Sequence, residues 1–331
     1  MDKYSPRQLC ALLWAALCAP LVTVCSAVSW PWVLLGTAGA GVILLPMGAV
    51  ARGLPAGDGA AELLRDAWGS GARPLSLISW LWLVLAASLA ASMAVTAFPR
   101  DRAFPLVPLV LLLLAAIPAA KGPAAACRFG ATLFLAVAPM MALVVLFGLA
   151  DVHWGSLEPA GTTAEAAAPM AALLLPGAAF FLRDRLADRP TPWLRWFLLA
   201  GVLALAVSVV CVGALGLPLA RAATNAFWFM SRSITVLGVM ERFEAVISAF
   251  MAISFCCLCT FLLSAGQRAL CAAVPAVTEP IAAWGTAVLA AAAFRLVPRI
   301  PEWGWFVGNL LFWGILPLAT LAVVLKRKYR K

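Results

Sequence analysis

The chain has 331 residues, of which 64% are hydrophobic and only 11% are charged, with a net charge of +10 and a mean hydropathy of +1.00. Soluble domains are about 45–50% apolar and about 25% charged, so this composition excludes an ordinary soluble domain. Its long apolar runs lack the period-two alternation of membrane β-strands, which excludes a membrane β-barrel. The sequence therefore predicts an all-α, polytopic transmembrane helical bundle, with residues 1–331 forming one integral membrane domain.

Ten apolar segments follow one another along the chain, each close to the roughly 20 residues that a membrane-spanning helix needs. The first run is too long for the apolar core of a cleavable signal peptide, so we interpret it as the first span. The first five segments are Leu9–Val28, Val33–Val50, Leu75–Phe98, Phe104–Ala120 and Phe129–Ala150. The second five are Ala166–Leu182, Trp193–Leu215, Phe243–Ala265, Pro280–Val297 and Trp303–Leu325.

The lysines and arginines predict how these spans are oriented. If the N-terminus is inside and the number of spans is even, most of the 24 basic residues fall in inner segments, as the positive-inside rule requires. This predicts a multi-pass protein of the bacterial cytoplasmic membrane with both termini cytoplasmic. Anionic lipid at the inner face accounts for the net charge, so we expect the lipid bilayer and no nucleic acid as a partner.

Reactive side chains are scarce in the predicted spans. The chain has one histidine, His153, and 14 acidic residues that lie mostly in loops or at helix ends, and no zinc-protease or phosphate-loop motif is present. The cysteines of the run Cys256–Cys259 lie in an apolar span, where cysteine behaves as a small apolar residue. The sequence therefore predicts no enzyme, no cofactor and no metal site, and favours transport or ligand sensing.

Two spans in matching positions are interrupted by proline. The first contains Pro20, and the sixth contains Pro176 followed by Gly177. Proline removes a backbone N–H and frees a carbonyl one turn earlier, and interrupted helices at matching places in two halves are typical of midplane ligand sites in inverted-repeat transporters. Prolines interrupt other spans here as well, so an alternative is ordinary helix irregularity. The predicted repeats cover about residues 8–150 and 164–326.

We predict that the ligand is contacted by these interruptions and by two hydroxyls just past the first of them. The predicted ligand-binding residues at the interruptions are Pro20, Thr23, Ser26, Pro176 and Gly177.

Three stretches resemble the spore-germination permease family, the GerAB-type B subunits of nutrient germinant receptors. They are the pentad Ser5–Leu9, the amphipathic stretch Gly59–Gly69 and the stretch Ser233–Ala245, which carries a Glu-Arg-x-Glu motif ahead of the eighth span. The resemblance implies the amino acid–polyamine–organocation transporter fold, a LeuT-like bundle of two inverted five-helix repeats. It also implies nutrient sensing at the inner spore membrane together with A-type and C-type receptor subunits.

The motif consists of Glu241, Arg242 and Glu244, and two interpretations stay open for it. The three residues would contact the ammonium and carboxylate of an amino-acid ligand, or the carboxylates would stabilise the N-terminus of the eighth span.

Three hypotheses for function follow from these features. The first is a permease-like subunit of a spore nutrient-germinant receptor that binds a small nutrient, an amino acid first of all. The second is an amino-acid secondary transporter of the same fold. The third is a non-catalytic membrane scaffold subunit.

Overall fold

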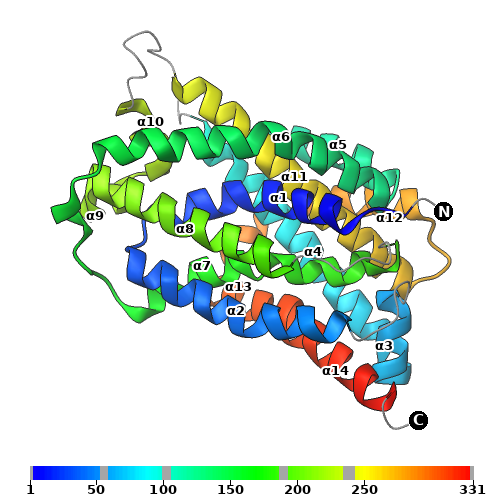
Figure 1. Ribbon diagram of the computed structural model, residues 1–331. Coiled ribbons are helices and arrows are strands. Elements are labelled where there is room, and N and C mark those ends of the chain that lie inside the picture. The colour runs from blue at the N-terminus through cyan, green and yellow to red at the C-terminus, as the bar shows by residue number, and fades with distance from the viewer. Residues whose placement is uncertain (1–2, 53–58, 99–105, 186–192, 234–242, 329–331) are drawn as a thin grey trace.

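The computed structural model describes residues 3–52, 59–98, 106–185, 193–233 and 243–328. Within these ranges the chain forms helices and short connections and contains no strand, which confirms the predicted all-α fold for this part of the protein. The helices form an elongated bundle, and both termini lie at the same end of it (Figure 1).

The bounds of the helices follow the predicted segments closely. The α-helices of the first half are α1 Pro6–Cys25, α2 Trp30–Arg52, α3 Ala60–Trp68, α4 Ala72–Met93, α5 Val107–Ala120 and α6 Pro123–Gly148. Those of the second half are α7 Ala167–Leu173, α8 Trp193–Leu215, α9 Leu217–Ala222, α10 Ala226–Ser233, α11 Phe243–Ala273, α12 Glu279–Ala292, α13 Glu302–Asn309 and α14 Leu316–Lys328. The short 3-10 turns are η1 Gly69–Gly71, η2 Ala94–Ala97, η4 Leu149–Asp151, η5 Trp154–Leu157, η6 Thr163–Ala166, η8 Ala293–Arg295 and η9 Val297–Arg299.

Eight of the described helical stretches are long and apolar enough to cross a membrane, which supports a multi-pass membrane protein. The fourth and ninth predicted spans are also helical, but α5 and α12 each have only 14 residues. At about 1.5 Å per residue, 14 residues cover about 21 Å of a hydrocarbon core that is about 30 Å thick.

The first helix starts where its sequence predicts. Ser5 and Gln8 form a capping box: the Gln8 N–H donates to Ser5 Oγ at 3.3 Å, and the Ser5 N–H donates to Gln8 Oε1 at 3.0 Å. Pro6 occupies the first turn, where its missing N–H costs nothing. The Tyr4 hydroxyl donates to the carbonyl of Leu182, which ties this start to a segment far along the chain.

Two of the predicted spans are not regular α-helices. The sixth, Ala166–Leu182, consists of the short α7 followed by η7, a 3-10 helix over Leu175–Arg185. The tenth contains η10, a π-helical segment over Leu310–Ile315 between α13 and α14.

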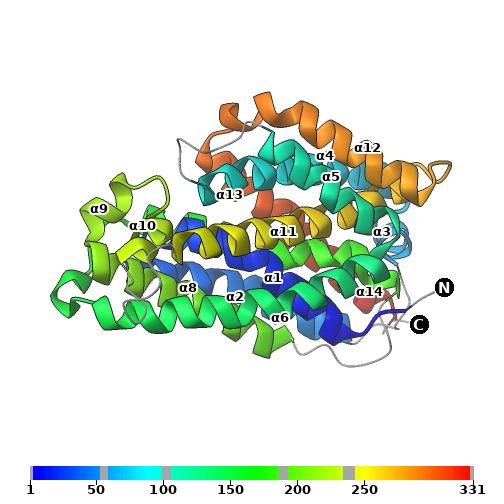
Figure 2. The same cartoon turned by 90° about the horizontal axis from the view of Figure 1, so that it is seen from above.

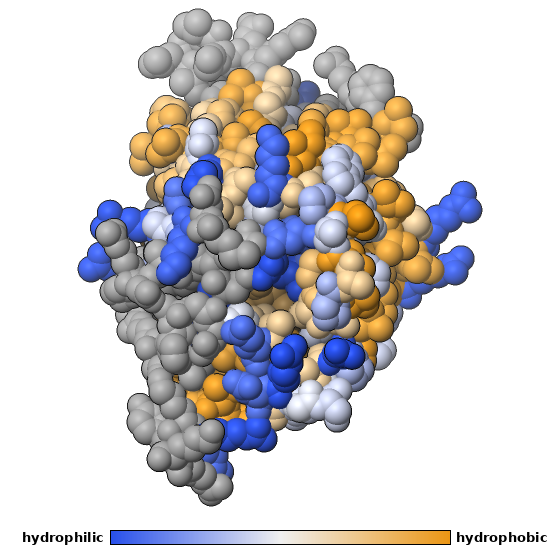
Figure 3. Space-filling model, turned by 90° about the vertical axis from the view of Figure 1, so that its right-hand side faces the viewer, coloured by the Kyte–Doolittle hydropathy of each residue, from blue (hydrophilic) through white to orange (hydrophobic). Residues whose placement is uncertain are grey.

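The centre of the bundle is formed by α1 and α11, which pack against each other and run side by side in Figure 2. Most of α1 is buried (78%), whereas only 22% of the most apolar part of α6 is buried, so α6 presents much of its surface to the lipid. Figure 3 looks onto the end that carries both termini, where hydrophilic residues gather between apolar flanks. Exposed arginines at this end include Arg7, Arg65, Arg73 and Arg195.

Candidate functional site

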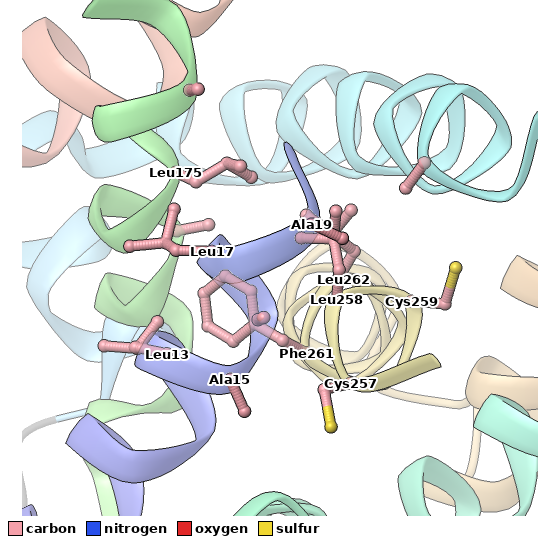
Figure 4. Packing of buried hydrophobic residues seen from close by; sticks show 14 of the residues in the cluster. Leu13, Ala15, Leu17, Ala19, Leu175, Cys257, Leu258, Cys259, Phe261 and Leu262 are labelled. Carbon is pink, nitrogen blue, oxygen red and sulfur yellow. The ribbon is translucent and has the colours of Figure 1, made fainter. Parts of the chain in front are cut away.

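The two interrupted segments lie together in the core of the bundle. Helix α1, which contains Pro20, packs against α7, which leads into η7 at Pro176. Figure 4 shows Leu13 and Leu17 on the side of α1 that faces away from α11, while Phe261 of α11 lies against α1. The structure therefore brings the predicted pair of interruptions into one region.

Helix α1 continues as an α-helix through Pro20, and a side chain from α11 bonds to its backbone just before the proline. The backbone N–H of Ala19 donates to Ser254 Oγ at 2.8 Å, and the same hydroxyl donates to the carbonyl of Ala15 at 2.5 Å. Ser254 thus bonds to both backbone groups of the helical pair Ala15 and Ala19, one residue before Pro20.

Ser254 was not among the predicted ligand residues, although it is fully buried and central to this region. A hydroxyl in the apolar middle of a span is the signal that could have identified it, although Ser248, Thr260 and Ser264 give the same signal in the same helix. Its partner on α1 could not be found from sequence, because 235 positions separate Ala19 from Ser254.

The two hydroxyls predicted to face a ligand are bonded within their own segment. Thr23 Oγ1 donates to the carbonyl of Ala19 at 2.9 Å, and Ser26 Oγ donates to the carbonyl of Thr23 at 3.4 Å. Ser26 is also almost fully buried. Both side chains therefore satisfy helix carbonyls in this conformation, and only their oxygen lone pairs are left to accept from another group.

Pro176 and Gly177 have different roles in the sixth segment. Pro176 has no N–H, so it cannot donate to the carbonyls of Ala172 or Leu173 one turn earlier. Gly177 makes a close crossing, because a Cβ added there would stand 1.7 Å from the backbone carbonyl oxygen of Trp313 in η10. Glycine at 177 is required by this contact between the 3-10 and π segments.

A small apolar cavity of about 40 Å³ adjoins this junction. Helices α1, α2 and α8 and the junction of α7 with η7 line it, and its walls include Leu45, Phe197 and Pro176. Trp14 and Trp196 also line it, and the ring of Phe134 joins them through centroid distances of 5.4 and 5.5 Å. Among the described residues, no charged side chain lines the cavity.

The structure describes only part of the predicted Glu-Arg-x-Glu motif. Glu241 and Arg242 lie outside the described residues, and Glu244 is the second residue of α11.

The cysteine run of α11 is distributed over different faces of the helix. Cys256, Cys257 and Cys259 are buried and unpaired, and Figure 4 shows Cys257 and Cys259 pointing in different directions. Within the described ranges, no group of three or more histidine, cysteine, aspartate or glutamate side chains is placed to hold a metal ion.

No protein-family model matches the chain, and a search of curated proteins finds no match.

Proposed function

We propose that the chain is a permease-like subunit of a spore nutrient-germinant receptor. In this proposal it binds a small nutrient, with an amino acid as the first candidate, in the inner spore membrane. Occupancy is relayed to A-type and C-type receptor subunits, and both termini face the cytoplasm.

One observation carries the proposal: in four of the five pairs of corresponding segments, the two segments pack against each other. The first segment packs against the sixth (α1 with α7), the second against the seventh (α2 with α8), the third against the eighth (α4 with α11) and the fourth against the ninth (α5 with α12). The third segment also packs against the ninth (α4 with α12), and the corresponding eighth segment packs against the fourth (α11 with α5). An inverted repeat around a two-fold axis produces such pairs, and this supports a transporter-like architecture of two five-helix halves.

The interrupted pair gives this architecture a place for the nutrient. Pro20 in α1 and Pro176 in η7 each leave backbone carbonyls without their usual helical donor, and in a membrane protein such groups persist where they are buried or line a cavity. Carbonyl groups at this junction can accept from the ammonium of an amino acid. The hydroxyl of Ser254 already bridges one gap, so α11 would sense any rearrangement of α1.

The apolar cavity is unsuited to the charged groups of such a nutrient. The described residues of its lining include no charged side chain, and an unpaired charge in apolar surroundings is very costly. In this proposal the charged groups of the nutrient are held on the other side of the junction, toward Thr23, Ser26 and the start of α11.

A genetic experiment tests the receptor function directly. Spores that lack the gene are exposed one at a time to a panel of amino acids, sugars and nucleosides, and germination is followed by the loss of optical density. We expect the response to at least one nutrient to disappear and to return with a plasmid copy. An unchanged response to every nutrient in the panel would contradict the proposal.

The same architecture favours a secondary transporter as the second candidate. Purified protein in proteoliposomes would then take up labelled amino acid in an ion-dependent manner. Binding without uptake, measured as a ligand-induced rise in melting temperature, favours the receptor. If the protein shows no uptake and no ligand raises its melting temperature, the scaffold subunit is the remaining hypothesis.

A further inference from the structure

The apolar cavity has chemistry that indicates an occupant other than the nutrient. Its described lining is apolar and includes Trp14, whose Nε1 is buried. Apolar walls suit a hydrocarbon occupant, because burying unpaired charged groups in apolar surroundings is very costly.

The cavity reaches the lipid-facing surface between α2 and α8. Farther from the end that carries the termini, these helices pack closely: a Cβ at Gly41 would stand 3.2 Å from the ring of Phe197, and one at Gly201 would stand 2.8 Å from Thr37. The cavity lies where this close packing ends. Leu45 lines the cavity and is also 38% exposed, so an occupant can enter from the surrounding bilayer.

The cavity is large enough for part of a lipid acyl chain but too small for a whole ligand molecule. A volume of about 40 Å³ holds about three water-sized groups, because roughly 10–15 Å³ of such volume is enough for one water, whereas ligand pockets usually measure about 300–1,000 Å³. With apolar walls, it suits a few methylene groups of an acyl chain whose remainder lies along the outside of the bundle.

Two arginines stand beside the cavity at the end of the bundle that carries both termini. Arg7 precedes Cys10 of the cavity by one turn of α1, and Arg195 directly precedes Trp196 on α8. Both are exposed, and neither forms an ion pair with any residue that the structure describes. Guanidinium groups pair well with phosphate, and this end is the one predicted to face the anionic inner leaflet.

We propose that this groove is a binding site for an anionic phospholipid. The phosphate pairs with Arg7 and Arg195, and the first part of the acyl chain fills the cavity against Leu45 and Phe197. Arg7 and Cys10 are separated by about 4.5 Å along α1, a distance that an extended arginine side chain covers. This site is separate from the nutrient site proposed above and does not depend on it.

The test measures the melting temperature of the full-length protein in nanodiscs. Discs of pure phosphatidylcholine are compared with discs containing increasing fractions of phosphatidylglycerol. We expect phosphatidylglycerol to raise the melting temperature with a saturating dependence. The Arg7→Gln/Arg195→Gln variant should need roughly 30-fold more of the anionic lipid for the same rise, because each arginine near an anionic surface contributes about fivefold.

The matched control is Arg65→Gln/Arg73→Gln, which removes two exposed arginines from α3 and α4 at the same end. It should keep the wild-type dependence. Equal dependence in the two double variants would overturn the proposal, as would equal stabilisation by phosphatidylcholine alone, which would indicate unspecific acyl binding.

A second variant keeps the proposal testable if the Arg7→Gln/Arg195→Gln protein does not fold. Ala200→Val adds two methyl groups to the wall of the cavity. We expect it to retain the melting temperature measured in pure phosphatidylcholine and to lose most of the rise caused by phosphatidylglycerol. A full rise in this variant would place the anionic lipid elsewhere.

Discussion

The hydroxyl of Ser254 completes the hydrogen bonding of α1, and its removal should be costly. Ser254→Ala leaves the N–H of Ala19 and the carbonyl of Ala15 without their partner in the core. We expect a loss of about 1–3 kcal/mol in the free energy of unfolding, measured by denaturation in detergent. Ser264→Ala is the control, because buried Ser264 only donates to the carbonyl of Thr260 in its own helix. It should cost less than about 1 kcal/mol, and equal losses would contradict the bridging role.

Gly177 should tolerate no side chain at all. In Gly177→Ala the new Cβ would meet the carbonyl oxygen of Trp313 at 1.7 Å, and backbone cannot move aside as a flexible side chain does. We expect a loss of about 3 kcal/mol or more, seen as a lower melting temperature or a failure to fold. Gly285→Ala is the matched control in α12, where no atom lies within 4 Å. It should be neutral or stabilising by up to about 1 kcal/mol.

At single positions, the sequence predicts that a residue is unusual but not which group it contacts. The sequence identified Gly177 as a place where the chain unwinds, but the reason for glycine is a contact with a segment more than 100 residues away. Thr23 and Ser26 were chosen because they are polar and follow Pro20, yet their hydroxyls bond to helix carbonyls. A hydroxyl in an apolar span is visible in the sequence, whereas the group that it bonds is set by tertiary packing.

The bonding of α1 to Ser254 should depend on Pro20. Proline at 20 crowds the carbonyl of Ala16 one turn earlier, and we expect this to widen the neighbouring ladder position where Ser254 bonds to Ala15 and Ala19. In Pro20→Ala the ladder can close, so a further Ser254→Ala change should cost less than it does in the wild type. A double-mutant cycle on unfolding free energies should give a coupling energy of about 0.5–3 kcal/mol.

The coupling would be absent if the serine only filled space. Additive effects of the two changes would show that Ser254 bonds to α1 independently of the proline.

At the level of helices, the apolar runs predicted most of the bundle correctly. The amphipathic stretch Gly59–Gly69 forms α3, and the Ser5 and Gln8 pair caps α1 as its spacing indicates. The irregular segments were harder to predict. The sequence located the break at Pro176 but not the 3-10 helix that follows it, nor the π-helical η10. These geometries arise where two backbones cross closely, and apolar periodicity carries no information about such crossings.

The position of both termini at one end of the bundle constrains how the whole chain is inserted (Figure 1). A chain that starts and finishes on the same side of a membrane crosses it an even number of times. Eight helices meet the length requirement, and α5 and α12 are the two short ones that would bring the number to ten. Because α5 and α12 pack against each other, they would cross together or stay out together, and both possibilities keep the number even.

Labelling of single introduced cysteines with a membrane-impermeant maleimide tests this arrangement. Lys3→Cys and Lys326→Cys should react from the same side of sealed vesicles, the cytoplasmic side if the positive-inside rule holds. Trp154→Cys, at a residue that is 71% exposed between α6 and α7, should react from the opposite side. The wild-type protein provides the background, which should be low because eight of its nine cysteines are buried and Cys271 is partly buried. Labelling of positions 3 and 326 from opposite sides would require an odd number of crossings, which is incompatible with the arrangement of the helices in this bundle.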